Sequence, residues 1–553
     1  MNNKLKIKFN YVFCLVYFLC YSLNTVAQNY TLQDTLRGSI TDERIWWDLT
    51  YYELEVSVNP VSKSIFGKNT IYYKVLDERN KMQIDLQSPM QLTKATQSGK
   101  SLSISREGNV YYIHLQEKSK KNNINNITVY FEGVPKEAVK APWDGGFSWN
   151  KDVNGQDFIA TSCQGIGASV WWPNKDHMYD EVDSMQISIN VPKPLKAISN
   201  GRLKKISESK NGTSYTWFVS NPINNYGVNI NIGNYVNFSE KYQGEKGILD
   251  MDYYVLKHNL EKAKKQFLDA PKMMKAFEYW FGPYPFYEDS YKLVEVPYLG
   301  MEHQSSITYG NKYKNGYLGQ DLSGTGWGLL FDFIIIHESG HEWFANNITN
   351  KDIADMWIHE GFTTHAESLF IDYYYGKEAS AAYVIGTRKR IQNEYPIIGD
   401  YNVNKEGSSD MYYKGANIIH MIRQICKGDE KWRQILRKMN TKFYHMTVST
   451  KQIEDFISSE IGWNLKPFFD QYLRDIRIPV LEYQIKDDSM IYRWINVINS
   501  FNMPIEIIDG DSKRWLYPTN SWKKTSVNSS KIDIDLDYYC LLYTSPSPRD
   551  LRL

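Results

Sequence analysis

The sequence is poor in three features: cysteine, net charge and long apolar runs. Only five of its 553 residues are cysteine, and the three beyond residue 27 lie at Cys163, Cys426 and Cys540 without paired spacing. They predict neither a disulfide framework nor a cysteine zinc site, and their odd number leaves at least one free thiol. The formal net charge of +1 gives no overall field that would attract nucleic acid or an anionic membrane. A mean hydropathy of -0.50 argues against a multi-span membrane protein.

The apolar run Tyr11–Leu23 is too short to span a bilayer comfortably. Three lysines precede it and the signature Thr25-Val26-Ala27 follows it, so residues 1–27 have the pattern of a signal peptide. We therefore expect a secreted or periplasmic protein without a stable membrane span, with association at the cell surface as an alternative. Acylation at Cys20 is less favoured, because bulky apolar residues stand directly before it.

Hydrophobic periodicity divides the rest of the chain into three parts. An apolar fraction of 42% and a length of 553 residues suit a globular protein with several cores. Two-residue alternation predicts strands up to about residue 240, helical spacing dominates from about 255 to 475, and alternation returns after Pro479. We predict a β-rich domain at 28–245, a mainly helical domain at 246–476 and a small β domain at 477–540. Residues 541–553 resemble a translated sequencing adapter and are predicted to be a non-native tail.

Individual elements follow from the same patterns. Inward-facing strand positions are predicted at Tyr52, Leu54, Val56 and Val58, at Ile187, Ile189 and Val191, at Val228, Ile230 and Ile232, and at Ile532, Ile534 and Leu536. Helices are predicted within 260–281, 329–346, 360–373, 379–393 and 417–425. Ser449 and Gln452 form a capping-box pattern, which predicts the start of a further helix that runs through Ile461.

The most specific pattern is His337-Glu338-Ser339-Gly340-His341. A four-residue step returns to the same helix face, so both imidazoles can bind one ion while Glu338 lies beside it. Eighteen residues separate His341 from Glu360, which begins a second helical segment and is the predicted third ligand. Three protein ligands leave one position free, as in catalytic rather than structural zinc sites. Gly340 weakens the first helix, so we expect packing to compensate.

These residues resemble peptidase family M1, the gluzincin aminopeptidases that include alanyl aminopeptidase and leukotriene hydrolase. The zinc signature matches, and Tyr412-Tyr413-Lys414-Gly415 matches the family's Tyr-x-Lys-Gly element. Gly300-Met301-Glu302-His303 resembles the Gly-x-Met-Glu-Asn exopeptidase motif, with Leu299 and His303 as departures, and Gln164 lies in a segment that resembles the strand and loop whose glutamine reaches the active site. The resemblance implies a saddle-like β-rich N-terminal domain, a thermolysin-like catalytic domain and a small C-terminal β domain.

The resemblance also implies residue roles, which the chemistry of the residues supports. One Zn²⁺ per chain is expected on His337, His341 and Glu360, with Glu338 as general base and Tyr412 as oxyanion donor. Glu302 is expected to hold the cationic α-amino group of a peptide, assisted by Gln164, and Gly300 and Met301 lie beside it. His303 is expected to titrate near neutrality and change that charge. His359 and His365 are expected to be structural, hydrogen-bonded histidines.

Three other functions are compatible with the sequence. A catalytically silent peptide-binding relative would keep the fold without the reaction, although Glu338, Glu360 and Tyr412 are all present. An adhesion or glycan-binding module is suggested only by the aromatic residues, among them Trp46, Trp47, Trp171 and Trp172. Hydrolysis of a lipid epoxide would use the same metal chemistry. The sequence predicts peptide substrates with a free N-terminus, and it predicts neither their first residue nor an oligomeric state.

Overall fold

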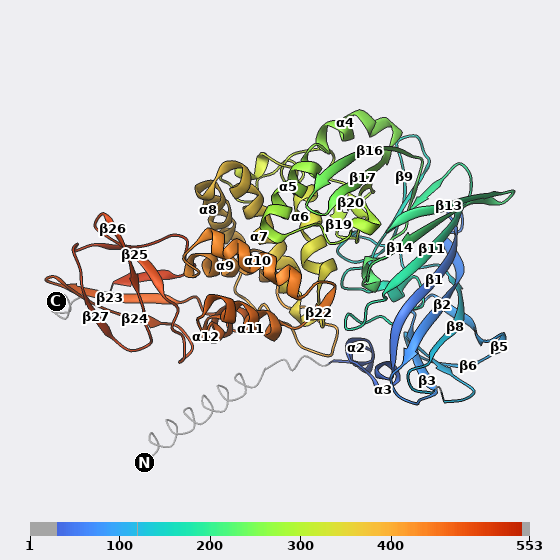
Figure 1. Ribbon diagram of the computed structural model, residues 1–553, viewed down its shortest axis with the longest axis horizontal. Helices are drawn as coiled ribbons and strands as arrows, with labels where there is room; N and C mark the ends of the chain where they lie inside the picture. Colours follow the sequence, from blue (N-terminus) through green and yellow to red (C-terminus); the bar gives the residue numbers. More distant parts are fainter. Residues whose placement is uncertain (1–29, 119, 545–553) are drawn as a thin grey trace, which may run out of the picture.

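The computed structural model describes residues 30–118 and 120–544. Three parts follow one another along its longest axis: strands at the N-terminal end, helices in the middle and a small group of strands at the C-terminal end (Figure 1). This order confirms the predicted fold class. The predicted signal peptide at 1–27 and residues 545–553 of the predicted tail lie outside the described residues.

The N-terminal part is built from three sheets. Two short helices, α2 (Leu32–Gly38) and α3 (Asp42–Ile45), precede them. The largest sheet has the order β13 (Arg202–Ser209), β14 (Gly212–Val219), β11 (Ser184–Val191), β1 (Trp47–Asn59), β2 (Ser64–Val75), β8 (Ile124–Gly133), β4 (Gln91–Gln97) and β5 (Lys100–Ser101). The second has the order β12 (Lys196–Ile198), β15 (Asn231–Gly233), β10 (Asp157–Ser162) and β9 (Gly146–Lys151), and the third β3 (Lys81–Asp85), β7 (Val110–His114) and β6 (Ser103–Glu107).

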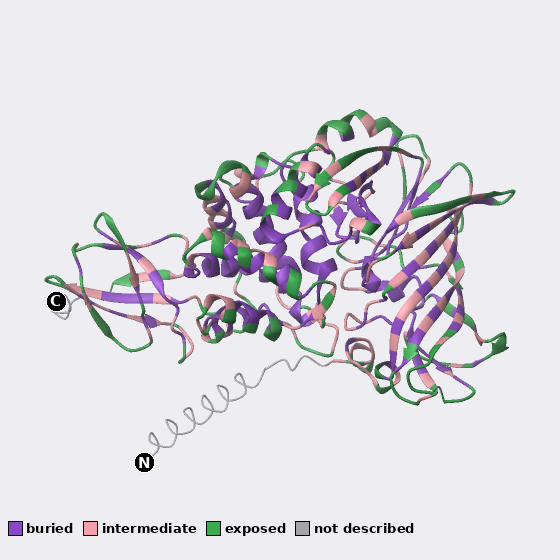
Figure 2. Cartoon of the chain, viewed as in Figure 1, coloured by how far each residue is buried: buried purple, intermediate pink, exposed green. Residues whose placement is uncertain are grey.

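The predicted alternation places one face of these strands in a core. Figure 2 shows buried and exposed residues alternating along the N-terminal strands. The predicted inward-facing residues of β1 and β11 are all buried. The four tryptophans that suggested a binding surface, Trp46, Trp47, Trp171 and Trp172, are at most 1% exposed, so they fill the core and offer no surface to a glycan.

A mixed sheet of parallel and antiparallel strands begins the middle part. Its order is β16 (Tyr235–Gly244), β17 (Gly247–Leu256), β18 (Tyr291–Glu295), β20 (Ile307–Tyr309) and β19 (Gly300–Met301). The predicted domain boundary after residue 245 falls between β16 and β17, which pair with each other along their whole length. The sheet of the middle part therefore begins at Tyr235.

Helices make up most of the middle part. They are α4 (Leu260–Gln266), α5 (Asp269–Phe281), α6 (Phe333–Gly340), α7 (Trp357–Tyr375), α8 (Lys377–Gly386), α9 (Asp410–Ile425), α10 (Asp429–Lys442), α11 (Thr450–Ile461) and α12 (Lys466–Leu473). The capping box is confirmed, because Ser449 and Gln452 cap each other's backbone at the start of α11. A parallel pair of strands, β21 (Ile348–Asn350) and β22 (Met446–Val448), joins the segment after α6 to the one before α11. Within the described residues, no helix has the length and apolar content that crossing a membrane requires.

The C-terminal part consists of two small sheets. One has the order β27 (Lys523–Ser526), β24 (Ser489–Ile495), β23 (Val480–Lys486) and β29 (Leu541–Thr544), and the other β26 (Ser512–Leu516), β25 (Ile505–Asp509) and β28 (Ile532–Ile534). The first four residues of the predicted tail thus pair with β23 as β29. The expectation for Leu536 is wrong: β28 ends at Ile534, so the alternation of the strand does not extend to Leu536, which is 71% exposed. Beyond the strand, the Leu536 carbonyl accepts a hydrogen bond from Arg388 of the middle part.

Candidate metal centre and cleft

Helix α6 carries the first two predicted metal ligands. Asp332 caps it, because its carboxylate accepts hydrogen bonds from the backbone nitrogens of Ile334 and Ile335. All residues of α6 are buried, which suits the apolar run at 333–336 that forms its first half. His337 lies in its last turn and His341 directly follows it. The four-residue step therefore brings the two imidazoles together, with their ring centroids 4.9 Å apart.

Helix α7 lies against α6 and carries the third predicted ligand. Glu360 is in its first turn and is 2% exposed. A β-carbon on Gly340 would lie 3.1 Å from Thr363 Cγ2 and 3.6 Å from Ala366 Cβ on α7. The glycine that weakens α6 thus allows the two helices to approach closely, which is the packing compensation that the sequence required.

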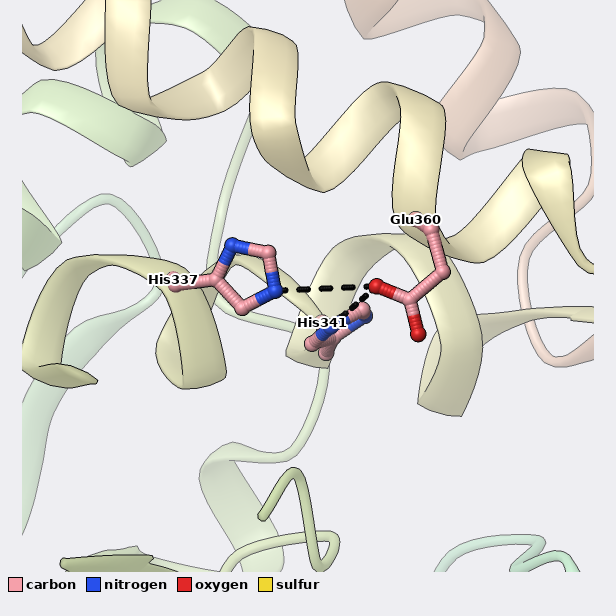
Figure 3. Close-up of side chains that lie close together, drawn as sticks. All are labelled: His337, His341 and Glu360. Carbon is pink, nitrogen blue, oxygen red and sulfur yellow. Dashed lines mark ion pairs between the residues drawn. The ribbon is translucent and has the colours of Figure 1, made fainter. Parts of the chain in front are cut away.

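The three predicted ligands converge on one point (Figure 3). Glu360 Oε2 lies 3.6 Å from His337 Nε2 and 3.4 Å from His341 Nε2, and it has no hydrogen-bond partner among the described residues. Bonds of about 2.0–2.1 Å to a tetrahedral ion separate neighbouring ligand atoms by roughly 3.3–3.5 Å. A buried carboxylate oxygen without a donor, at these distances from two imidazole nitrogens, fits one zinc ion.

The other nitrogen of each imidazole is held by a residue that the sequence analysis missed. His337 Nδ1 lies 2.7 Å from Glu367 Oε1, and the Tyr383 hydroxyl donates to Glu367 Oε2 at 2.6 Å. His341 Nδ1 lies 3.1 Å from the carbonyl of Phe344. These contacts direct both Nε2 atoms toward Glu360, as outer contacts of metal-bound histidines do. Glu367 was within reach of sequence reasoning, because it follows Glu360 by seven residues and so lies about two turns further on the same face of α7.

Tyr412 reaches the site from the first turns of α9. Its ring centroid lies 6.3 Å from that of His337. A β-carbon on Gly415 would lie 2.9 Å from the α-carbon of Gly361, so these two glycines allow α9 to pack closely against α7. Burial, together with the carboxylates of the site, raises the pKa of Tyr412 well above its ordinary value. Its hydroxyl therefore keeps its proton and is available as a donor.

The predicted exopeptidase residues come from two separate segments of the chain. Glu302 follows edge strand β19 and is 2% exposed, and its Oε1 has no hydrogen-bond partner among the described residues. A β-carbon on Gly300 would lie 2.6 Å from Ile334 Cγ2, so this glycine allows β19 to lie against α6. The Nε2 amide of Gln164, from the N-terminal part, donates to Glu360 Oε1 at 2.9 Å. The site thus joins the two larger parts of the molecule.

These side chains share one cleft of about 1190 Å³. Its walls include all nine predicted site residues: Gln164, Gly300, Met301, Glu302, His337, Glu338, His341, Glu360 and Tyr412. Burial raises the pKa of Glu338 to about 7, and neighbouring His337 opposes that shift. A carboxyl with its pKa near neutrality can both accept and return a proton.

One expectation about this site is wrong. His303 does not titrate near neutrality, because burial lowers its pKa to about 3. The neutral ring lies 3.2 Å from Thr308 Oγ1 and does not line the cleft. The contacts of His359 and His365 agree with the prediction that both are structural histidines. Asn350 N donates to His359 Nε2 at 2.7 Å, and His365 Nδ1 lies 3.2 Å from Ser368 Oγ.

Known families match both larger parts of the chain. Residues 266–472 match the Peptidase family M1 domain, and residues 49–226 match the Peptidase M1 N-terminal domain. The chain belongs to peptidase family M1. The predicted resemblance is therefore confirmed, and zinc, the metal named for solved M1 structures, suits the three donors described above. Helix α2 and Tyr30 precede the matched N-terminal domain.

Individual M1 proteins show how far the similarity extends. A probable aminopeptidase 1 from Sulfurisphaera tokodaii is 22% identical over 73% of this chain and 52% of its own length. Leukotriene A-4 hydrolase from Xenopus laevis is 25% identical over 59% of this chain and 54% of its own length. The chain thus spans about half the length of these curated relatives. An M1 zinc metallopeptidase variant from Deinococcus radiodurans, solved with a Tyr-Ser-Ala substrate, shares the fold with a TM-score of 0.66 at 17% identity, over 79% of this chain and 96% of its own.

Proposed function

We propose that this protein is a zinc-dependent aminopeptidase that hydrolyses the first peptide bond of peptides with a free N-terminus. The observation that carries the proposal is the buried Glu302 carboxylate, unpartnered at Oε1, in the same cleft as the His337, His341 and Glu360 cluster. One curated relative is named a probable aminopeptidase and another a leucyl aminopeptidase, and a structural neighbour was solved with a tripeptide substrate.

The buried carboxylate explains why hydrolysis would be confined to chain ends. The α-amino group of a peptide has a pKa of about 8 and is largely cationic at neutral pH. Glu302 Oε1 would accept a charge-assisted hydrogen bond from it, which an internal peptide nitrogen cannot offer with the same charge. Gln164 donates its amide to Glu360, and its side-chain carbonyl, which has no donor among the described residues, would accept a second hydrogen bond from the same ammonium group.

The reaction follows from the residues around the scissile bond. Zinc held by the three ligands would act as a Lewis acid and make a water molecule more acidic. Glu338 would accept the proton from that water and return it to the leaving amine. As the carbonyl carbon becomes tetrahedral its oxygen gains negative charge, and the Tyr412 hydroxyl would donate a hydrogen bond to it.

Matched substrates test this proposal. Aminoacyl anilides with a free or an acetylated amino group would be compared for the wild type and for Glu338→Gln, with and without a chelator. The free substrate should be hydrolysed only by metal-loaded wild type. Equal hydrolysis of the acetylated substrate would reject the exopeptidase assignment, and bound zinc without turnover of any peptide would favour a peptide-binding protein.

We also propose export of the chain, on the pattern of residues 1–27 alone. Expression of the full chain in a bacterial host should yield a protein that begins at Gln28 in the periplasm or medium. Retention of Met1 on protein that stays in the cytoplasm would contradict export.

A further inference from the structure

The cleft carries opposite charges at separate places. Carboxylates surround the metal centre, at Glu302, Glu338 and Glu360. Another part of the wall includes Lys389 and Arg390, from the segment that follows α8. A peptide with free ends has the complementary arrangement, with a cation at its first residue and an anion at its last.

Arg390 is exposed in the cleft with most of its guanidinium free. Its Nε donates to the Leu322 carbonyl at 3.1 Å, and its guanidinium carbon lies 5.8 Å from the ring centroid of Tyr413. Across residues 30–118 and 120–544, neither Nη atom has a hydrogen-bond acceptor or a carboxylate partner. The two Nη groups are therefore available as the fork that binds a carboxylate with two parallel hydrogen bonds. Lys389 Nζ, held at 3.0 Å from the Ser323 carbonyl, adds a second positive charge beside it.

The backbone of this segment is tied to the helix that carries Tyr412. The buried Asp410 carboxylate, at the start of α9, accepts hydrogen bonds from the backbone nitrogens of Gln392 at 2.8 Å and Asn393 at 2.7 Å. Arg388, two residues before Arg390, is fixed by Asn417 on α9 at 2.6 Å. The segment that carries Lys389 and Arg390 is thus fixed at both ends relative to Tyr412.

Short distances between neighbouring rings limit how far Arg390 lies from the metal centre. The His337 and Tyr412 ring centroids are 6.3 Å apart, and those of Tyr412 and Tyr413 are 6.5 Å apart. With the 5.8 Å from Tyr413 to Arg390, these distances limit the separation to the length of about five residues of an extended peptide, which spans about 3.3 Å per residue.

We propose that Arg390, assisted by Lys389, binds the C-terminal carboxylate of short peptides, so that the substrates are free-ended peptides of at most about five residues. This inference rests on the proposed aminopeptidase function. It predicts a preference for a free C-terminal carboxylate over a C-terminal amide, two substrates whose contacts with the metal centre are otherwise the same. The charge at the far end of the substrate therefore separates binding at Arg390 from binding at the metal centre.

The test uses the zinc-loaded full chain and three substrates. These are trialanine with a free C-terminal carboxylate, trialanine amide, and an alanyl anilide that has no carboxylate. Wild type, Arg390→Gln and a matched control, Arg106→Gln, would be assayed for kcat/KM. Arg106 suits the comparison because its Nε also donates to a backbone carbonyl and its guanidinium also lies over a tyrosine ring, but it is exposed on β6, outside the cleft.

Wild type and Arg106→Gln should prefer the free acid to the amide by roughly three- to fivefold, as an exposed charge pair allows. Arg390→Gln should lose that preference and keep its rate on the anilide. An acid-to-amide ratio near or below one in the wild type for every length from two to five residues would overturn the proposal, and so would a ratio that survives Arg390→Gln. The measurement of the acid-to-amide ratio on peptides of two to five residues uses only the wild type, so it tests the proposal even if Arg390→Gln fails to fold.

Two further outcomes locate a failure. Wild type that hydrolyses neither the anilide nor any peptide would refute the aminopeptidase proposal and, with it, this one. A glutamate side chain is another source of a carboxylate: if an Ala-Ala-Glu amide gains rate over trialanine amide while the trialanine acid does not, the assignment to the C-terminal carboxylate is wrong.

Discussion

Replacing Glu367 with glutamine should weaken zinc binding without removing a ligand. Glu367 Oε1 lies 2.7 Å from His337 Nδ1, and the residue is 1% exposed. The carboxylate fixes which nitrogen of the imidazole carries the proton and increases the electron density on Nε2. Glutamine keeps the shape and an oxygen at this position but loses the charge, so the effect on zinc reports the electrostatic part of the contact.

The expected size follows from that contact. Loss of such a carboxylate–histidine contact costs about 10- to 100-fold in metal affinity, which is about 1.4–2.7 kcal/mol. Low exposure places the effect in the upper half of that range, because no water can replace the lost partner. The Tyr383 hydroxyl, which donates to the other oxygen of Glu367 at 2.6 Å, makes Tyr383→Phe a milder version of the same change.

Competition with a chromogenic chelator would measure the zinc dissociation constant at fixed pH. The order should be wild type tightest, Tyr383→Phe intermediate and Glu367→Gln weakest. Glu454→Gln serves as the control, because that buried carboxylate on α11 pairs with Arg474 and does not line the cleft. Zinc affinity within twofold of wild type in Glu367→Gln would refute the reasoning, as would an equal loss in Glu454→Gln.

Three further changes test the framework around the metal. Tyr412→Phe should lower kcat by roughly 100- to 1000-fold with zinc content unchanged, and a loss below threefold would exclude the hydroxyl as the oxyanion donor. Gly415→Ala should cost about 1–3 kcal/mol of stability, seen as a lower thermal midpoint, because the new β-carbon would lie 2.9 Å from the α-carbon of Gly361; an unchanged midpoint would contradict that packing. Burial raises the pKa of Asp332 to about 7, above its ordinary 3.8, so its contribution to stability is fully present below about pH 4 and is lost as pH rises through 7. The thermal midpoint of wild type should therefore fall relative to that of Asp332→Asn between pH 4 and pH 8, and a constant difference would count against this assignment.

Local sequence rules predicted the metal ligands because their spacing is set by one helix. His337 and His341 are one turn apart, and any helix in that segment brings them together. The capping box at Ser449 succeeded for the same reason, since it involves only neighbouring residues. Predicting Glu360 required a second helix to pack against the first, and its place at the start of the next helical segment was the sequence signal for that step.

Features that depend on tertiary packing were less accessible. The charge of His303 follows from complete burial, which the sequence around it does not reveal. The close approach of Gly361 to Gly415 joins two helices whose relation no single segment encodes. The location of Arg390 in the cleft likewise depends on Asp410, whose carboxylate binds the backbone of the segment directly after Arg390.

Metal content tests the central claim most directly. Protein purified without added chelator would be analysed for bound metal by mass spectrometry, as wild type and as Glu360→Ala. The account predicts one zinc per wild-type chain and a clear loss of zinc in the variant, because Glu360 Oε2 lies within 3.6 Å of both imidazole nitrogens. Wild type without stoichiometric metal, or a variant that keeps its full zinc content, would contradict it.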